Sequence, residues 1–158
     1  MNTTYHMKNT TLCYIEKDGA YLMMHRVKKK NDINHDKWVG IGGKFEASET
    51  PFDCARREFK EETGALPIGL WYRGLVTFVS DEYGTEYMHL FTAKDFEGQI
   101  NYQCAEGELV WVDKNKIKDL PIWEGDKIFF ELLDTESRFF SLKLEYKGDK
   151  LINHVIEF

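Results

Sequence analysis

The sequence predicts a mixed fold of the α/β (α+β) class, in which many strands accompany two helices. Runs of β-branched and aromatic residues flank three turn signals, at 18–19, 81–84 and 147–149. Two other stretches, 51–63 and 123–133, repeat apolar residues at three- and four-residue spacing, which is typical of amphipathic helices. Strands and helices bury their apolar faces against one another, so we expect a sheet packed against helices.

The predicted elements follow one another without an internal repeat or a linker, which favours a single domain over residues 1–158, with residues 1–6 expected to be disordered. The lysine-rich loop at 27–36 is typical of a solvated surface, although a loop here could also cover a ligand. In chain order the elements are strands 10–15 and 21–25, the loop 27–36, a glycine-containing segment 38–45, a helix from residue 51, strands 70–79 and 86–93, a short buried strand 109–112, a helix 123–133, and strands 139–146 and 150–158.

The helix that starts at residue 51 has clear end signals. Thr50 can accept a hydrogen bond from an N–H group of the first turn, and Pro51 is tolerated at the first helical position. Gly64 can adopt the left-handed conformation that ends a helix. The apolar stripe that should face the core consists of Phe52, Ala55 and Phe59.

The same helix carries a high density of carboxylates. Glu58 and Glu62 lie one turn apart, with Glu61 beside them. Like charges at this spacing destabilise a helix, so a positive group should offset their repulsion. Oxygen ligands at this density suit Mg²⁺ or Mn²⁺, whereas a solvated acidic face is the alternative.

The spacing of the whole stretch decides between these alternatives. Its fixed positions are Gly43, then after five residues Glu49, then after seven residues Arg57-Glu58-Phe59-Lys60-Glu61-Glu62-Thr63-Gly64-Ala65. This pattern resembles the Nudix box of the Nudix hydrolases, which runs Gly, five residues, Glu, seven residues, Arg-Glu-apolar-x-Glu-Glu-x-Gly-apolar. Every charged and glycine position matches; an aromatic Phe59 and a small Ala65 depart from the usual aliphatics. The resemblance implies the Nudix fold, a curved mixed β-sheet sandwiched between helices.

The resemblance also implies roles for the acidic residues of the box. Glu58 and Glu62 would be metal ligands, and Glu61 would be a further ligand or the base that orients water. The backbone carbonyl of Gly42 or Gly43 would complete the metal shell. The expected cofactor is Mg²⁺, with Mn²⁺ as the alternative.

Three further residues are expected to support this site. Glu49 would lie near the ligands, held by Arg57, whose planar guanidinium suits a bidentate carboxylate. Glu106 stands five residues before Trp111, where many family members place another acid near the metals. A solvated loop is the alternative for Glu106, and the neighbouring Glu108 could be confused with it.

Segments outside the box resemble the MutT-type enzymes that hydrolyse oxidised purine nucleoside triphosphates, and in particular the MutX-like branch of bacterial 8-oxo-dGTP diphosphatases. The segments concerned are 37–44, 123–126, 139–140 and 147–149. The eukaryotic enzymes of this kind carry an asparagine after the first tryptophan and two aspartates after the later one. This chain has Val39 and Gly125-Asp126 instead, which affects how a base would be discriminated.

Four residues are candidates for contacting a nucleotide. Arg26 and Lys44 are candidates for the phosphates, although lone basic residues are often simply solvated. Trp123 offers a ring face for stacking on the base, and Asp126 offers an acceptor for purine N–H groups. The alternative is that Trp123 caps the core and that Asp126 only favours the helix N-terminus by its charge.

The function that the resemblance implies is Mg²⁺-dependent hydrolysis of a nucleoside triphosphate, such as 8-oxo-dGTP, to a nucleoside monophosphate and pyrophosphate. A broader pyrophosphatase acting on other nucleotides or nucleotide sugars is one alternative. A non-catalytic nucleotide sensor of the same fold is another, and loss of box glutamates would mark it; none is lost. Monomer and homodimer both remain open.

Composition limits the partners and the location. The net charge of −6 argues against non-specific binding to nucleic acid or to anionic membranes. No apolar run reaches membrane-spanning length, and the N-terminus lacks the apolar core of a signal peptide. The three cysteines, Cys13, Cys54 and Cys104, are odd in number and widely spaced, which favours buried thiols in a reducing cytoplasm. Met1 and Met7 are both possible start sites.

Overall fold

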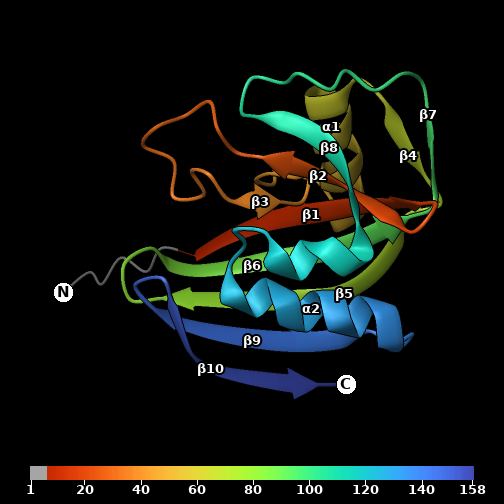
Figure 1. Ribbon diagram of the computed structural model, residues 1–158. Coiled ribbons are helices and arrows are strands. Elements are labelled where there is room, and N and C mark those ends of the chain that lie inside the picture. The colour runs from red at the N-terminus through yellow and green to blue at the C-terminus, as the bar shows by residue number, and fades with distance from the viewer. Residues whose placement is uncertain (1–6) are drawn as a thin grey trace.

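The computed structural model describes residues 7–158, and its main element is an eight-stranded mixed sheet (Figure 1). The disorder expected for 1–6 lies outside the described residues. The strand order is β10-β9-β5-β6-β1-β2-β3, with β8 also paired to β2; the β1–β6 and β5–β9 pairs are parallel and the others antiparallel. The strands are β1 Met7–Lys17, β2 Ala20–His25, β3 Trp38–Val39, β5 Trp71–Ser80, β6 Gly84–Ala93, β8 Glu108–Asp113, β9 Phe140–Lys147 and β10 Lys150–Glu157.

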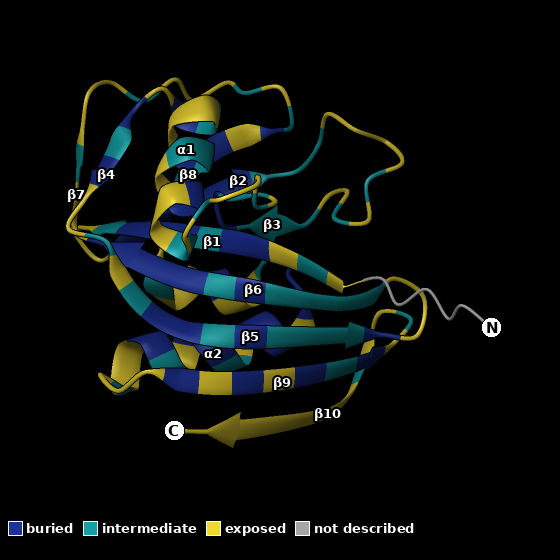
Figure 2. Cartoon of the chain, turned by 180° about the vertical axis from the view of Figure 1, so that it is seen from behind, coloured by how far each residue is buried: buried dark blue, intermediate teal, exposed yellow. Residues whose placement is uncertain are grey.

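Two helices cover opposite faces of this sheet. Helix α1 (Pro51–Thr63) lies on the face seen in Figure 2, and helix α2 (Glu124–Thr135) lies on the face seen in Figure 1. Each helix has its own core: Ala55 and Phe59 of α1 pack with Phe91, and Phe129 of α2 packs with Phe140. The predicted sandwich of helices around a mixed sheet is therefore confirmed.

The strands β1 and β2 separate soon after their turn, and this separation makes room for the site. They pair only at Glu16–Tyr21 and Lys17–Ala20. Farther along, the segment that leads into α1 takes the place of β2 beside β1, through bridges that join Thr10 to Lys44 and Cys13 to Ile41. The start of the box is thereby fixed to the central sheet.

The ends of α1 are those expected from the sequence. The Thr50 hydroxyl accepts a hydrogen bond from the Asp53 backbone N–H at 3.1 Å, and the Thr50 N–H donates to the Asp53 carboxylate at 3.0 Å. Gly64 ends the helix with φ of 81°. The expected apolar stripe needs one correction, because Phe52 is 36% exposed and meets the ring of Phe91 edge-on at the rim of the core.

The three predicted hairpins and the second helix are also present, with ends displaced by a few residues. Two short strands, β4 (Leu66–Ile68) and β7 (Asp95–Glu97), form a separate two-stranded sheet that the sequence did not predict. A 3-10 helix, η1 (Lys114–Asp119), precedes α2. In the described part of the chain, no helix is both long and apolar enough to cross a membrane.

Candidate active site

A cavity of about 940 Å³ lies against β1, α1 and the start of α2, and the loop at 26–37 forms one of its walls. Its volume is in the range of small-molecule sites. Nine of the residues with expected roles line this cavity. They are Arg26, Gly42, Gly43, Lys44, Glu58, Glu62, Glu106, Trp123 and Asp126.

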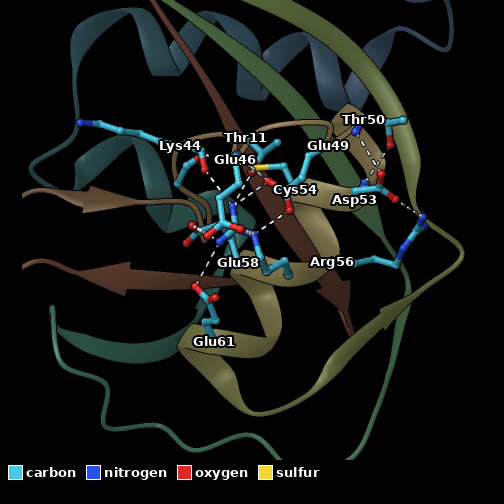
Figure 3. Close-up of polar contacts among 12 residues, drawn as sticks. Thr11, Lys44, Glu46, Glu49, Thr50, Asp53, Cys54, Arg56, Glu58 and Glu61 are labelled. Carbon is cyan, nitrogen blue, oxygen red and sulfur yellow. Dashed lines mark hydrogen bonds and ion pairs between the residues drawn. The ribbon is translucent and has the colours of Figure 1, made fainter.

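Arg57 holds the carboxylates at the start of the box together, as Figure 3 shows for its partners. Its guanidinium donates to both oxygens of Glu49, at 2.6 and 2.9 Å, and to one oxygen of Glu58 at 2.7 Å. A further N–H group donates to the backbone carbonyl of Lys44 at 2.9 Å. Hydrogen bonding to Glu49, followed by that to Glu58, raises the pKa of Arg57 well above its usual value. The bidentate Arg57–Glu49 pair expected from the sequence is therefore present.

Glu49 and Glu61 lie beside the cavity and are not among the residues that line it. The hydrogen bond from Arg57 holds the pKa of Glu49 below its usual value, and the N–H of Glu46 adds a second bond at 2.7 Å. The Glu61 side chain is 58% exposed and meets Arg57 at 3.2 Å. A direct role of either residue in the reaction stays a prediction.

Glu62 is the most perturbed acid of the box. One of its carboxylate oxygens is buried and has no hydrogen-bond partner among the described residues. Burial, followed by the charges of Glu106 and Glu58, raises the pKa of Glu62 to about 9. Burial also raises the pKa of Glu58, against the opposing effect of Arg57. Glu106, far from the box in the sequence, thus lies close to Glu62, and its role at a metal ion stays a prediction.

The glycines before the box are required by close contacts. A Cβ atom at Gly43 would lie 2.5 Å from the carboxylate of Glu58, and one at Gly42 would lie 1.7 Å from the carbonyl oxygen of Thr11. Such separations are shorter than non-bonded atoms allow. The Gly43 carbonyl accepts a hydrogen bond from the Thr11 N–H at 3.0 Å, which fixes this backbone to β1. Only glycine therefore lets the backbone pass beside the box carboxylates.

Trp123 and Asp126 line another part of the same cavity. Trp123 is 6% exposed and packs edge-on against Phe78 and Tyr146, with ring centroids 5.3 and 5.1 Å apart. It therefore belongs to the core and also contributes to the cavity wall. Burial raises the pKa of Asp126 to about 8, partly opposed by the ammonium of Lys37.

The two basic candidates differ in their surroundings. Arg26 is engaged in ion pairs, with Asp32 at 2.6 Å and with Glu106 at 2.8 Å. It is less free to meet phosphate than the sequence suggested. Lys44 is exposed, and Figure 3 shows its amine pointing away from the box carboxylates.

The loop at 26–37 contributes residues that the sequence did not single out. The Trp123 indole N–H donates to the side-chain oxygen of Asn34 at 2.8 Å, and the ammonium of Lys37 lies 4.6 Å from the centre of the Trp123 ring. Lys29 meets Glu106 at 3.4 Å. The loop is therefore attached to both chemically distinct parts of the cavity. Polar composition was the only signal for it in the sequence.

Comparison with known proteins shows the family. A family model described as the NUDIX domain matches residues 6–133. The chain belongs to the Nudix hydrolase family. The Bacillus subtilis Nudix hydrolase YvcI is 32% identical over 125 residues, which cover 77% of this chain and 75% of that protein. The oxidized purine nucleoside triphosphate hydrolase of Danio rerio is 31% identical over 155 residues, which cover 95% of this chain and 94% of that protein.

Solved structures show the same Nudix fold. The crystal structure of a MutT protein from Bacillus halodurans superposes with a TM-score of 0.83 at 26% identity, covering 95% of this chain and 97% of that one. A MutT protein from Methanosarcina mazei superposes with a TM-score of 0.71 at 23% identity, covering 87% and 99%. The second likeness concerns the fold alone.

The Nudix box of this chain offers a donor set that fits a divalent cation. Residues 7–158 contain no ready-made cluster of three metal-ligating side chains, and Arg57 occupies one oxygen of Glu58. One buried oxygen of Glu62 nevertheless has no hydrogen-bond partner among the described residues, and Glu106 and Glu58 bring more carboxylate charge to it than the nearby Arg26 offsets. Mg²⁺ and Mn²⁺ prefer oxygen donors of this kind. Glu58, Glu62 and Glu106 would hold such an ion, with the Gly43 backbone beside them.

Proposed function

We propose that this protein hydrolyses nucleoside triphosphates to nucleoside monophosphates and pyrophosphate with the help of Mg²⁺ or Mn²⁺, and that oxidised purine nucleotides such as 8-oxo-dGTP are its preferred substrates. The observation that carries this proposal is the make-up of one cavity. Glu58, Glu62 and Glu106 line one part of it, and Trp123 and Asp126 line another. A nucleotide needs both kinds of surroundings, one for phosphate and one for a base.

The chemistry at the acidic part follows from charge. A divalent ion, when bound, neutralises phosphate charge and positions the scissile bond. Glu58, Glu62 and Glu106 would supply the oxygens for such an ion. Arg57 keeps Glu58 oriented through the bond at 2.7 Å and has no free edge for the substrate, because its other N–H groups meet Glu49 and a backbone carbonyl.

The attack by water, and the roles of the residues around it, rest on the family resemblance. Water would attack the β-phosphorus, with Glu61 orienting it or helping to hold the ion and with Glu49 supporting the site through Arg57. Lys44 lies at the cavity, but its amine would have to turn toward the acidic part to meet phosphate oxygens, because it points away from the box carboxylates. Arg26 would do so only from within its ion pairs with Asp32 and Glu106.

The preference for oxidised purines is supported from two sides. Trp123 and Asp126 lie together in the wall of the cavity, where an aromatic surface and a carboxyl group could meet a base and its N–H edge. The relative from Danio rerio, which matches nearly the whole chain, is named an oxidized purine nucleoside triphosphate hydrolase.

The proposal is tested by a substrate panel with Mg²⁺. We expect kcat/KM to be highest for 8-oxo-dGTP, lower for dGTP and other nucleoside triphosphates, and lowest for ADP-ribose. Hydrolysis in ¹⁸O-water should place the label in pyrophosphate. A preference for ADP-ribose or a nucleotide sugar would support the broader pyrophosphatase, and tight nucleotide binding without turnover would support a sensor. Label found only in the monophosphate would show attack at the α-phosphorus.

A further inference from the structure

Asn34 is fixed in the cavity wall by nearly all of its polar groups. Its backbone N–H donates to the Asp32 carboxylate at 3.1 Å, and its backbone carbonyl accepts from the Lys37 N–H at 2.8 Å. Its side-chain oxygen accepts the indole N–H of Trp123 at 2.8 Å. Asn34 lines the cavity together with Trp123 and Asp126. The side chain is therefore held in one position before any ligand binds.

The contact with Trp123 also fixes which end of the Asn34 amide faces which way. An indole nitrogen can only donate a hydrogen bond, so its partner must be the amide oxygen. The amide NH₂ group then points away from the indole, and its two N–H groups have no acceptor among residues 7–158. The cavity wall thus carries an oriented pair of donors that the fold itself does not use.

Trp123 connects this donor group to an acid through two hydrogen bonds. Its indole N–H holds Asn34, and its backbone carbonyl accepts the N–H of Asp126 at 3.0 Å. A donor and a carboxyl group are thereby attached to one aromatic residue in one wall. A 6-oxopurine presents the matching edge, with a carbonyl acceptor at C6 next to an N1–H donor. A 6-aminopurine presents the reverse order, with donors at C6 and an acceptor at N1.

We infer that the side-chain NH₂ group of Asn34 donates a hydrogen bond to the C6 carbonyl of a 6-oxopurine nucleotide and thereby excludes 6-aminopurines. This inference rests on the proposed function, because it assumes that the base of a nucleotide occupies this part of the cavity. A 6-amino group would face the donors of Asn34 without an acceptor, and unpaired polar groups in a binding site are the strongest source of discrimination between similar ligands.

The test compares dITP with dATP, which differ in the group at C6 and in the protonation of N1. The decisive variant is Asn34→Asp, which keeps an oxygen for the Trp123 indole and removes the donor group. We expect the ratio of kcat/KM for dITP to that for dATP to fall at least about tenfold, mainly through KM. Asn34→Ala removes both contacts and should lower the same ratio, with an added loss of thermal stability.

Asn31→Asp is the matched control, because Asn31 lies on the same loop and also lines the cavity. The substitution makes the same change in charge as Asn34→Asp. It should leave the ratio within about twofold of the wild-type value. If Asn34→Asp also keeps the wild-type ratio while the wild-type protein hydrolyses both nucleotides, the inference is wrong and the proposed function stands.

If the wild-type protein hydrolyses no nucleoside triphosphate, the proposed function is wrong, and titration calorimetry with IMP and AMP tests the inference directly. Preferential binding of IMP that Asn34→Asp abolishes would support it. Equal binding, or no binding of either monophosphate, would overturn it.

Discussion

Replacing Glu62 with glutamine tests the assignment of the metal site most directly. The substitution keeps the size of the side chain and removes its charge. One oxygen of Glu62 is buried without a hydrogen-bond partner, and the charges of Glu106 and Glu58 act on it. Because its pKa is raised to about 9, Glu62 must take up a proton on folding at neutral pH when no metal is bound, and this uptake costs free energy that a neutral glutamine avoids. We expect the variant to fold with at least the stability of the wild-type protein when no divalent ion is present.

The size of the effect follows from linkage between binding and folding. An ion at one hundred times its Kd stabilises a protein by about 2.7 kcal/mol, which raises Tm by roughly 5–10 °C for a chain of this size. Without the charge of Glu62, we expect the shift in Tm to fall below about 2 °C. Turnover should fall at least about a hundredfold, because a metal ligand is lost.

The assay is thermal unfolding with EDTA and with a series of Mg²⁺ concentrations, followed by kcat at saturating Mg²⁺. Glu131→Gln is the matched control, since Glu131 is an exposed glutamate on the other helix. Its shift in Tm with Mg²⁺ should equal that of the wild-type protein. A Glu62→Gln variant that keeps the full Mg²⁺-dependent shift and near-normal kcat would refute the placement of the ion at Glu62.

Two further predictions concern groups on either side of the cavity. Arg57→Lys keeps the charge but cannot make the paired bonds to Glu49, so kcat/KM should fall by about ten- to a hundredfold. The control is Arg56→Lys at the exposed neighbouring residue, which should change kcat/KM less than twofold. Burial raises the pKa of Asp126 from 3.8 to about 8, so the folded protein holds this proton more tightly than the unfolded chain. The free energy of unfolding is therefore highest below about pH 4 and falls as the pH rises to about 8. The stability of Asp126→Asn relative to the wild-type protein should therefore increase by up to about 1.4 kcal/mol per pH unit in that window. Urea unfolding at pH 5 and pH 8 measures this difference in stability. A difference of equal size at both pH values would contradict the burial of this charge.

Most of the fold could be predicted because its signals are local. The three hairpins are marked by turn residues within a few positions, and α1 is marked by Thr50 and Gly64 at its ends. The small sheet of β4 and β7 has no such signal, because strands of three residues are too short to show alternation and Pro67 lies within one of them. The order of strands in the main sheet depends on long-range packing that no local pattern encodes.

The site was predictable to the extent that it is compact in sequence. The box spans one loop and one helix, so its spacing revealed Glu58, Glu62 and their partner Arg57. Asn34 and Trp123 are separated by 89 positions, and their contact depends on the path of an irregular loop. For the same reason the sequence offered Arg26 only as a candidate for phosphate contact or as a solvated residue, whereas the folded loop pairs it with acids.

The separation of β1 and β2 explains why both parts of the cavity occur together. Because the two strands pair only beside their turn, the segment at 40–44 can lie along β1 in place of β2. Gly43 in this segment brings the backbone against Glu58, and Gly40, three residues earlier, lines the same cavity as Trp123. Three residues of extended chain span at most about 10 Å, so Gly40 lies within that distance of the backbone at Gly43. If the proposed function is right, this glycine-rich segment would help to set the spacing between the phosphate and the base of the substrate.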